Sequence, residues 1–554
     1  MNSNTKLAFL ITIVFILYNI TEINSQDFEL KLLSKVKKEN IVLSEINYPN
    51  KHKDSTSIEN EITRVTNQLK KRGYFLNTVD SIIYTNRKVK AYFSLKEKIT
   101  SIILEIKPSY LVYFNKNKLK NNKIKIPIEN LDKLLSSITS KLDKQGKSFS
   151  SVEINNIILN KDELFGLLVI KESKKRTIDK ITIRGYEQFS QVYLKMYLRI
   201  KKGDIFNEDL IKRTSNLTKR LSFIDQIKEP EILFTKDSTI LYIYLRKNQN
   251  NSLDALVNFA TEENGDFLLN GNIDLELNNI LNSGEQFKLF WNRIGQERQE
   301  FKLSTSIPYI FKSNITPQIA FSLYRQDSSF TNINFKTSLS YNLNDKNSVS
   351  AFYSIENSEN LESITNDIKE YDNYFIGLNY DYNNLKEKTI YNELSFSIST
   401  GIGSRKSDNQ SFQQYNFKSS LSFLIKFNQR NQFYIRNKTG LLESKNYLTN
   451  ELLRIGGANS IRGFNEQSIF AKQFSFFNFE YRFITNQNSY LYTITDIGGY
   501  KQENNYKSLI GLGFGYLFGN DKYTINLALA TGKFDSSKLE LQNTKFLISW
   551  INYF

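Results

Sequence analysis

The side chains that carry most enzyme chemistry are scarce in this chain of 554 residues, which has no cysteine and a single histidine, His52. Without a thiol there is no disulfide, no cysteine-ligated metal and no cysteine nucleophile. One imidazole leaves no histidine pair for a zinc site. Neither a Gly-x-Ser-x-Gly elbow nor a Gly-x-x-x-x-Gly-Lys phosphate loop occurs. We therefore expect no enzymatic activity, no metal and no cofactor.

Two glycine-rich segments remain as candidates for special chemistry. Gly511, Gly513 and Gly515 resemble a nucleotide loop only superficially, because no helix is expected after them and they alternate with apolar residues as in a strand. The second segment, residues 454–464, sets an arginine among glycines and apolar side chains. Its notable residues are Gly456, Gly457, Ile461, Arg462, Gly463 and Phe464. What this arginine does depends on the elements that surround it.

The segments around this arginine have the pattern of β-strands. Residues 250–554 are dominated by a period of two, in which one face of each segment is apolar or aromatic and the other is polar. Sixteen such segments can be counted, and most are ten to twelve residues long. A tilted strand crosses a bilayer in ~9–11 residues, and single-chain outer-membrane barrels have an even number of strands.

The number and length of these segments predict a 16-stranded antiparallel transmembrane β-barrel, whereas a soluble sandwich would share only the alternation. The last segment ends on aromatic residues, Trp550 and Phe554, which we interpret as a terminal strand signal. The first segment, residues 253–260, looks shorter than the last, residues 544–554. We therefore expect these two strands to pair imperfectly and to leave backbone groups free.

The net charge differs between the two halves of the chain that this change of pattern separates. Residues 1–247 contain 45 Lys and Arg against 27 Asp and Glu, a net charge of +18, whereas the remainder carries −1. A solvated surface explains the excess most simply, and attraction to anionic lipid headgroups or acidic clients is the alternative. The lysines are scattered, and an exported chain meets little nucleic acid, so no nucleic-acid partner is expected.

The N-terminal half repeats one pattern three times, at a spacing of about 75 residues. The predicted repeats are residues 27–97, 98–173 and 174–247, each read as strand, two helices and two strands. The helices should cover one face of a small mixed sheet. This order, with a glycine before an aromatic residue after the second helix, resembles the POTRA domain. The resemblance implies periplasmic docking modules that capture partner strands at a sheet edge.

Residues 1–25 are predicted to be a signal peptide. Lys6 precedes an apolar stretch, residues 7–18, which as a helix covers ~18 Å and is too short to span ~30 Å of hydrocarbon. Ser25 fits a cleavage site, but Ile23 departs from the small-residue rule, so the cleavage position stays open. No later stretch is long and apolar enough to form a transmembrane helix.

Residues 454–464 resemble the loop motif of the POTRA-and-barrel outer-membrane assembly and translocation superfamily, the bacterial surface antigen family. That motif is Gly-Gly, a spacer, and hydrophobic-Arg-Gly-aromatic. In the family the loop folds back into the barrel, and its arginine pairs with acidic residues on the next two strands. The resemblance implies that Arg462 pairs with Glu480 and Asp496, in a fork geometry that lysine cannot match. Ile494 replaces the family's usual aromatic residue, and the alternation leaves the facing of Asp496 open.

The resemblance implies an outer-membrane barrel that assembles, inserts or translocates client proteins, with its N-terminal domains in the periplasm docking client or partner strands. Three repeats are most like the TamA type of translocation and assembly module. An exporter of the two-partner-secretion type and a passive porin are the alternatives. Expected partners are the outer-membrane bilayer, client outer-membrane or secreted proteins, and an inner-membrane protein or lipoproteins.

Overall fold

The computed structural model describes residues 28–114, 119–261, 267–294, 298–361, 368–384, 394–502, 505–535 and 537–554. The predicted signal peptide lies outside these residues. The chain divides into two compact units, Met1–Arg176 with Ile205–Glu208, and Thr177–Asp204 with Asp209–Phe554. In the described parts of the chain, no helix has the length and apolarity needed to cross a membrane.

The first sheet of unit 1 has the order β2-β1-β4-β3, in which β1 and β4 are parallel. Helix α3 buries an apolar stripe because its Ile58, Ile62, Val65 and Leu69 recur at helical spacing. Asp54 caps this helix by accepting a hydrogen bond from the Ser57 backbone N–H at 2.7 Å. The elements are β1 (Phe28–Leu33), α2 (Lys37–Ser44), β2 (Lys51–His52), α3 (Ser55–Lys71), β3 (Thr78–Thr85) and β4 (Lys88–Ser94).

The second sheet of unit 1 has the order β6-β5-β8-β7 and a single described α-helix, α4. The expectation of two helices is wrong here, because a 3₁₀ helix, Pro108–Tyr113, and strand β6 follow β5. The aromatic and β-branched residues after Pro108 have low helix propensity, which favours this short element. The elements are β5 (Ser101–Ile106), β6 (Lys123–Pro127), α4 (Leu131–Lys144), β7 (Ser151–Asn160) and β8 (Glu163–Lys171).

Unit 2 begins with a third α+β domain. Its sheet has the order β10-β11-β9, with β9 and β11 parallel and β10 antiparallel to β11. Leu241, Ile243 and Leu245 on alternate positions of β11 are fully buried, as the period of two predicts. The elements are β9 (Lys180–Arg184), α5 (Gln191–Leu198), α6 (Glu208–Thr218), β10 (Ile224–Phe234) and β11 (Thr239–Lys247).

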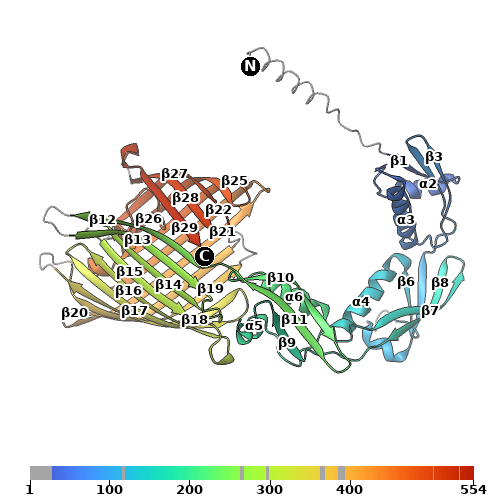
Figure 1. The fold of residues 1–554 in the computed structure, drawn as a ribbon, viewed down its shortest axis with the longest axis horizontal. Coiled ribbons are helices and arrows are strands. Elements are labelled where there is room, and N and C mark those ends of the chain that lie inside the picture. Colours follow the sequence, from blue (N-terminus) through green and yellow to red (C-terminus); the bar gives the residue numbers. More distant parts are fainter. Residues whose placement is uncertain are drawn as a thin grey trace, which may run out of the picture. The chain divides into compact units, whose positions relative to one another are not determined.

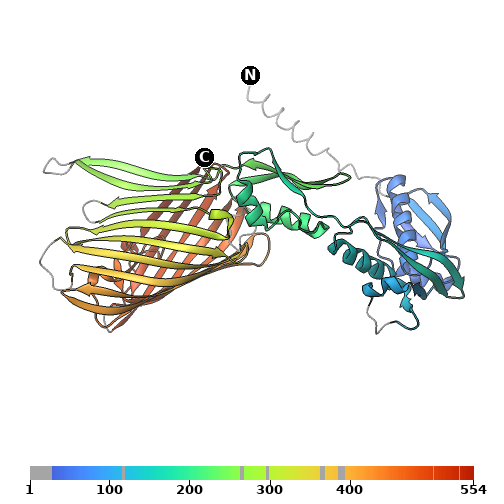
Figure 2. The same cartoon turned by 90° about the horizontal axis from the view of Figure 1, so that it is seen from below.

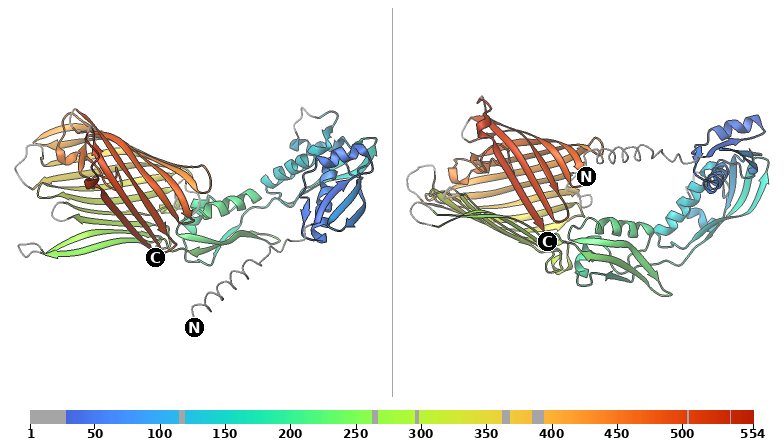
Figure 3. Two further views of the ribbon diagram at one scale, coloured as in Figure 1. Left: turned by 90° about the horizontal axis from the view of Figure 1, so that it is seen from above. Right: turned by 45° about the horizontal axis from the view of Figure 1, so that its top comes forward.

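The rest of unit 2 is a closed antiparallel barrel of sixteen strands, which confirms the predicted fold class. The strands follow one another in chain order around the wall, green to red in Figures 1 and 2, and run obliquely between the two rims (Figure 3). They are β12 (Ser252–Thr261), β13 (Phe267–Asn278), β14 (Gln286–Ile294), β15 (Arg298–Ser306), β16 (Ile315–Gln326), β17 (Phe330–Asn342), β18 (Asn347–Asn360), β19 (Tyr371–Asn384), β20 (Leu394–Ser407), β21 (Gln410–Lys426), β22 (Asn431–Ser444), β25 (Gln473–Asn486), β26 (Ser489–Lys501), β27 (Tyr506–Gly519), β28 (Tyr523–Phe534) and β29 (Lys545–Tyr553).

The outer surface of the barrel is apolar. Large side chains such as Phe477, Phe514 and Ile548 are 44–63% exposed there, although such residues are normally withdrawn from water. An exposed apolar band around a closed barrel is what a bilayer covers. Polar residues such as Asn478 and Glu480 occupy the alternate positions and are buried against the lumen.

The third α+β domain is joined to one rim of the barrel, which we call the proximal rim and which includes the turns at 279–285, 307–314 and 343–346. Arg199 donates a hydrogen bond to the Asn342 carbonyl at 3.0 Å, and Arg220 pairs with Asp345. Gly284 lies so close to the Tyr193 ring that a Cβ there would be 2.2 Å from it. The opposite rim is called the distal rim below.

Candidate functional site

The segment between β22 and β25, residues 445–472, starts at the distal rim and folds back into the barrel lumen. Two short strands within it, β23 (Leu453–Ile455) and β24 (Ile469–Ala471), pair with each other and form a stem. Beyond the stem, Ile461 and Phe464 pack with wall residues such as Phe476 in one buried apolar cluster. This packing holds the glycine-arginine segment against the inner wall.

Arg462 is 7% exposed and forms two ion pairs with the barrel wall. Its Nε donates to Asp496 Oδ2 at 2.9 Å and its Nη2 to Oδ1 at 2.7 Å, which is a bidentate fork. Nη1 donates to Glu480 Oε1 at 2.6 Å. The backbone N–H of Arg462 also donates to Asp496 Oδ2, at 2.8 Å. The structure thus brings together the three residues that the sequence motif singles out.

A fourth residue, Arg482, completes the site. Glu480 Oε2 accepts hydrogen bonds from Arg482 Nε at 2.8 Å and Nη2 at 2.6 Å, and the guanidinium lies 4.1 Å from the centre of the Tyr434 ring. The positive charges of two arginines and the negative charges of two carboxylates therefore balance in one buried group, which we call the Arg462 cluster. Alternation along β25 places Arg482 on the lumen face, but no signal in the sequence indicates its role.

Asp496 faces the lumen and is fully buried. Ile494 and Tyr492, at the preceding alternate positions of β26, are also buried, at 1% and 6% exposure. The alternation that looked unclear in the sequence is therefore regular on this strand. Ile494 fills a position in the apolar wall, so replacing the family's aromatic residue there leaves the carboxylate aimed at Arg462.

Glycines allow the loop to approach the wall closely. Gly463 has φ +92°, and a Cβ there would lie 2.4 Å from the Thr531 carbonyl carbon. Gly456 and Gly457 also have positive φ values, of +112° and +90°. On the wall itself, a Cβ at Gly511 would be 2.2 Å from the Arg462 carbonyl oxygen. At Gly511 the loop backbone therefore fills the space that a side chain would otherwise need.

We predict that Gly511→Ala displaces the loop without altering any charge. The new methyl group must push the Arg462 backbone away from the wall, and overpacking of this kind costs about 1–3 kcal/mol. The expected result is a lower unfolding temperature of the barrel, measured by heat-dependent gel mobility of the purified protein. Leu512→Ala, on the lipid face of the same strand, is the control. A Gly511→Ala barrel as stable as the wild type would contradict the close packing.

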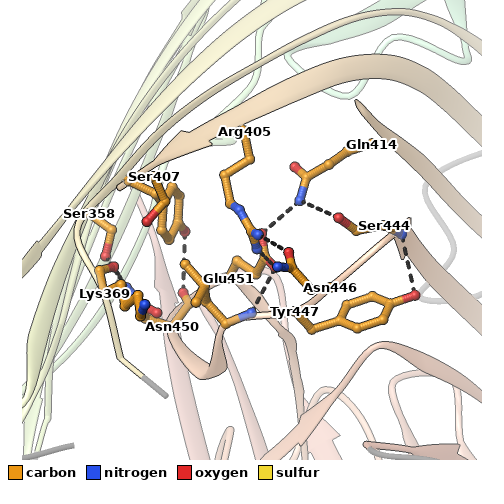
Figure 4. Close-up of polar contacts among 12 residues, drawn as sticks. Ser358, Lys369, Arg405, Ser407, Gln414, Ser444, Asn446, Tyr447, Asn450 and Glu451 are labelled. Carbon is orange, nitrogen blue, oxygen red and sulfur yellow. Dashed lines mark hydrogen bonds and ion pairs between the residues drawn. The ribbon is translucent and has the colours of Figure 1, made fainter. Parts of the chain in front are cut away.

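The start of the loop is fixed by a second group of polar residues, shown in Figure 4. Glu451 and Arg405 of β20 form an ion pair in which both side chains are 1% exposed. Glu451 also accepts hydrogen bonds from Gln414 Nε2 at 2.7 Å and from the Leu448 backbone N–H at 2.9 Å. We call Arg405, Gln414 and Glu451 the Glu451 cluster. No motif marks it in the sequence, where Arg405 and Glu451 are 46 residues apart.

Asn450 extends this attachment to strands β17 and β18. Its Nδ2 donates to Ser358 Oγ at 2.7 Å and to the Lys369 carbonyl at 2.8 Å, and its own carbonyl accepts from Asn332 Nδ2 at 2.7 Å. Near the other end of the loop, Gln467 donates to Glu300 of β15 at 2.9 Å. The loop is therefore attached to several walls of the lumen rather than to the Arg462 cluster alone.

The seam between the first and last strands is weakly paired. Strands β12 and β29 share only the register pairs Ser252↔Tyr553 and Leu253↔Asn552, whereas β12 pairs with β13 along its whole length. Outside the two strands, the backbones of Asn251 and Phe554 also bond to each other. The expected difference in length is wrong, since β12 has ten residues and β29 has nine. The short pairing arises from where the strands meet, which strand lengths cannot reveal.

The terminal aromatic residues lie on the outside of this seam. Trp550 is 57% exposed and Phe554 is 50% exposed, on the apolar outer surface. On the inner side, Ser549 Oγ donates to Asp254 Oδ2 at 3.3 Å. Among the described residues, no group of three or more His, Asp or Glu side chains is arranged to hold a metal ion.

Known families match both parts of unit 2. The model of the haemolysin secretion/activation proteins ShlB/FhaC/HecB matches residues 255–518, and the POTRA model, described as a surface antigen variable number repeat, matches residues 176–248. Together they cover more than half of the chain. No curated protein matches the chain.

Solved structures with a similar fold include CdiB from Acinetobacter baumannii, at 15% identity over 89% of this chain and 97% of that chain, with a TM-score of 0.51. CdiB from Escherichia coli is similar at 12% identity over 89% of this chain and 98% of that chain, also with a TM-score of 0.51. BamA from Haemophilus ducreyi lacking POTRA domains 1–3 has 14% identity over 77% of this chain and 93% of that chain, with a TM-score of 0.48.

The family matches, the closed barrel and its apolar outer surface agree with one another. They confirm the predicted location in a Gram-negative outer membrane, with the POTRA domains in the periplasm. Proteins of this family and fold are transport and assembly factors. The chain belongs to the superfamily of POTRA-and-barrel outer-membrane proteins, whose barrels insert or translocate client proteins.

Proposed function

We propose that this protein moves client polypeptides at the seam between β12 and β29. The observation that carries the proposal is the seam's two register pairs in an otherwise continuous wall. Beyond these pairs, the facing edges of β12 and β29 present N–H and C=O groups that an incoming strand can bond. The imperfect pairing expected from the sequence rested on strand lengths, whereas the register of the two strands now supports the proposal.

The neighbouring strands make such an opening possible without unfolding the barrel. Strand β29 pairs with β28 at eight positions, and β12 pairs with β13 at ten. Separating the seam breaks little backbone pairing, because each edge strand keeps its other neighbour. A client strand entering there gains hydrogen bonds at once, so transport needs no nucleotide, metal or chemical step.

We assign the Arg462 cluster a positioning role in this function. Glu480 and Asp496 lie on β25 and β26, and the Arg462 carbonyl packs on Gly511 of β27. Gly463 packs on β28, which is the strand next to β29. The loop therefore holds together the four strands that precede the seam. In this proposal the loop keeps the last strands in place while β12 moves.

The domain division into residues 27–97, 98–173, 174–247 and 250–554 supports the same proposal. The three N-terminal domains dock client strands, and an inner-membrane protein or lipoproteins bind there as partners. The haemolysin-secretion model over the barrel supports export of a dedicated substrate, whereas three repeats support the TamA type. Depleting the protein and comparing the outer-membrane and secreted proteomes separates these two types, since each depletes a different fraction.

The seam is tested by locking it with a disulfide. Ser252→Cys with Tyr553→Cys places a thiol pair at a register position, in a chain that has no other cysteine. Oxidation should abolish client insertion or export, and reductant should restore it, because the locked strands cannot accept a third. The measurement is client assembly by the same purified protein in lipid vesicles under both conditions.

The matched control is Thr524→Cys with Ile551→Cys, which links β29 to its other neighbour, β28. This disulfide should leave transport unchanged. A seam-locked protein that still moves clients would refute the proposal. The same experiment tests the passive-porin alternative. A passive porin would assemble no client in either state, so client assembly that the seam disulfide blocks excludes it.

A further inference from the structure

A polar cavity of about 490 Å³ lies in the barrel lumen beside the start of the loop. The inner faces of strands β15 to β22 line it on one side, and residues 450–454 line it on the other. Its wall carries amide side chains, those of Asn332, Asn334, Asn373 and Asn416, together with the apolar side chains of Phe352 and Phe375. Such a mixture suits a peptide segment better than a purely apolar ligand.

The three carboxylates in this cavity already have partners. Glu300 pairs with Lys302 at 2.5 Å. Glu356 accepts a hydrogen bond from the Tyr371 hydroxyl at 2.6 Å, and Glu451 belongs to the Glu451 cluster. Glu356 receives its hydrogen bonds from uncharged groups and attracts Lys418. Because Glu300 and Glu451 are paired with other cations, the lining of the cavity still keeps an excess of positive charge.

Three cations that line the cavity have no such partner. Among the described residues, no carboxylate lies within ion-pair distance of Lys336, Lys418 or Arg454. Lys336 and Arg454 instead lie over aromatic rings, with 4.1 Å and 3.6 Å to the ring centres. Lys418 lies close enough to both of the others to repel them, and Glu356 is the carboxylate that attracts it across the cavity.

We propose that this cavity binds an acidic segment of a client polypeptide, whose carboxylates pair with Lys336, Lys418 and Arg454. The proposal rests on the transport of clients proposed above, which brings polypeptide to the lumen. Three like charges facing one cavity are stabilised by an anion, and the amide side chains around them can bond a peptide backbone. The cavity size suits a few residues rather than a folded domain.

The probe is a fluorescent hexaglutamate peptide, and the measurement is its binding to the full-length protein in lipid nanodiscs. Lys336→Gln with Lys418→Gln should weaken binding roughly tenfold or more, because each charge-assisted hydrogen bond contributes that order of affinity. Lys336→Arg with Lys418→Arg should keep most of the binding. Heat-dependent gel mobility establishes that each variant barrel is folded.

The matched control is Lys312→Gln with Lys522→Gln, which removes two exposed lysines from turns outside the lumen. This variant should bind hexaglutamate as the wild type does. Equal binding by the Lys336/Lys418 variant would overturn the site. Equal binding of hexalysine would also overturn it. Competition by inorganic phosphate at the same concentration as the peptide would overturn it too, because that result would indicate a site for small anions only.

The binding assay separates this site from the proposed function. The seam-locked protein should bind hexaglutamate normally while its transport is blocked. If locking leaves transport intact and binding still depends on Lys336 and Lys418, the seam proposal fails and the acidic-peptide site stands. If locking blocks transport and the lysines have no effect on binding, the site fails alone.

Discussion

Arg462→Ala should abolish client transport and lower the stability of the barrel. The substitution removes the bidentate bond to Asp496 and the bond to Glu480. Glu480 keeps Arg482, but Asp496 is fully buried and loses its guanidinium. Within the described parts of the chain, Asp496 then retains only the Arg462 backbone N–H as a hydrogen-bond donor. Breaking a buried ion pair by removing one partner typically costs about 3–5 kcal/mol. The loop would then detach from strands β25 and β26.

The measurements are client assembly in vesicles and the temperature at which the folded barrel loses its fast gel mobility. Arg430→Ala, which removes an exposed arginine from a turn, is the control and should behave as the wild type. Arg462→Lys should also fail, because an ammonium cannot make the planar fork to Asp496. Transport at the wild-type rate by Arg462→Ala would contradict the role of the cluster.

Glu451→Ala should release the start of the loop from strands β20 and β21. Arg405 is 1% exposed, and without Glu451 its charge keeps, among the described residues, only the side chain of Asn446 as a hydrogen-bond partner. The expected loss of stability is again about 3–5 kcal/mol. Because the loop occupies the lumen, we also expect a higher steady ion conductance in planar bilayers.

A double substitution distinguishes the buried charge from the loss of packing. Glu451→Leu with Arg405→Met removes both charges and keeps apolar volume, so it should recover much of the stability that Glu451→Ala loses. Conductance should stay raised, because the polar attachment of the loop is still weakened. If the double variant is as unstable as the single one, the ion pair is not the source of the effect.

These two predictions assign different tasks to the start of the loop and to its middle. The Arg462 cluster attaches it to β25 and β26, on the side of the seam. The Glu451 cluster attaches it to β20 and β21, which precede β22 and lie farther from the seam along this side of the barrel. Loss of the first is expected to impair transport, and loss of the second to open the lumen.

Much of the barrel could be predicted because its determinants are local. A period of two needs only neighbouring residues, and it predicted the sixteen strands that close the barrel. The motif around Arg462 is also contiguous in sequence. The first helix expected in the second repeat is wrong for a local reason too, since the segment after Pro108 favours a 3₁₀ turn.

Other features depend on residues that meet only in the folded chain. Arg405 and Glu451 form no sequence pattern, and the pairing of β12 with β29 joins the two ends of the barrel. The cations of the lumen cavity come from β17, β21 and the loop.

The sequence by itself determined the strand-rich membrane half, the basic repeat-containing half and the loop arginine with its two acidic partners. These features could be predicted because alternation and motif spacing depend on the local order of residues. Only the tertiary structure decided which charges are neutralised and which backbone edges are free, because closing the barrel sets the register of its ends and brings distant side chains into one lumen.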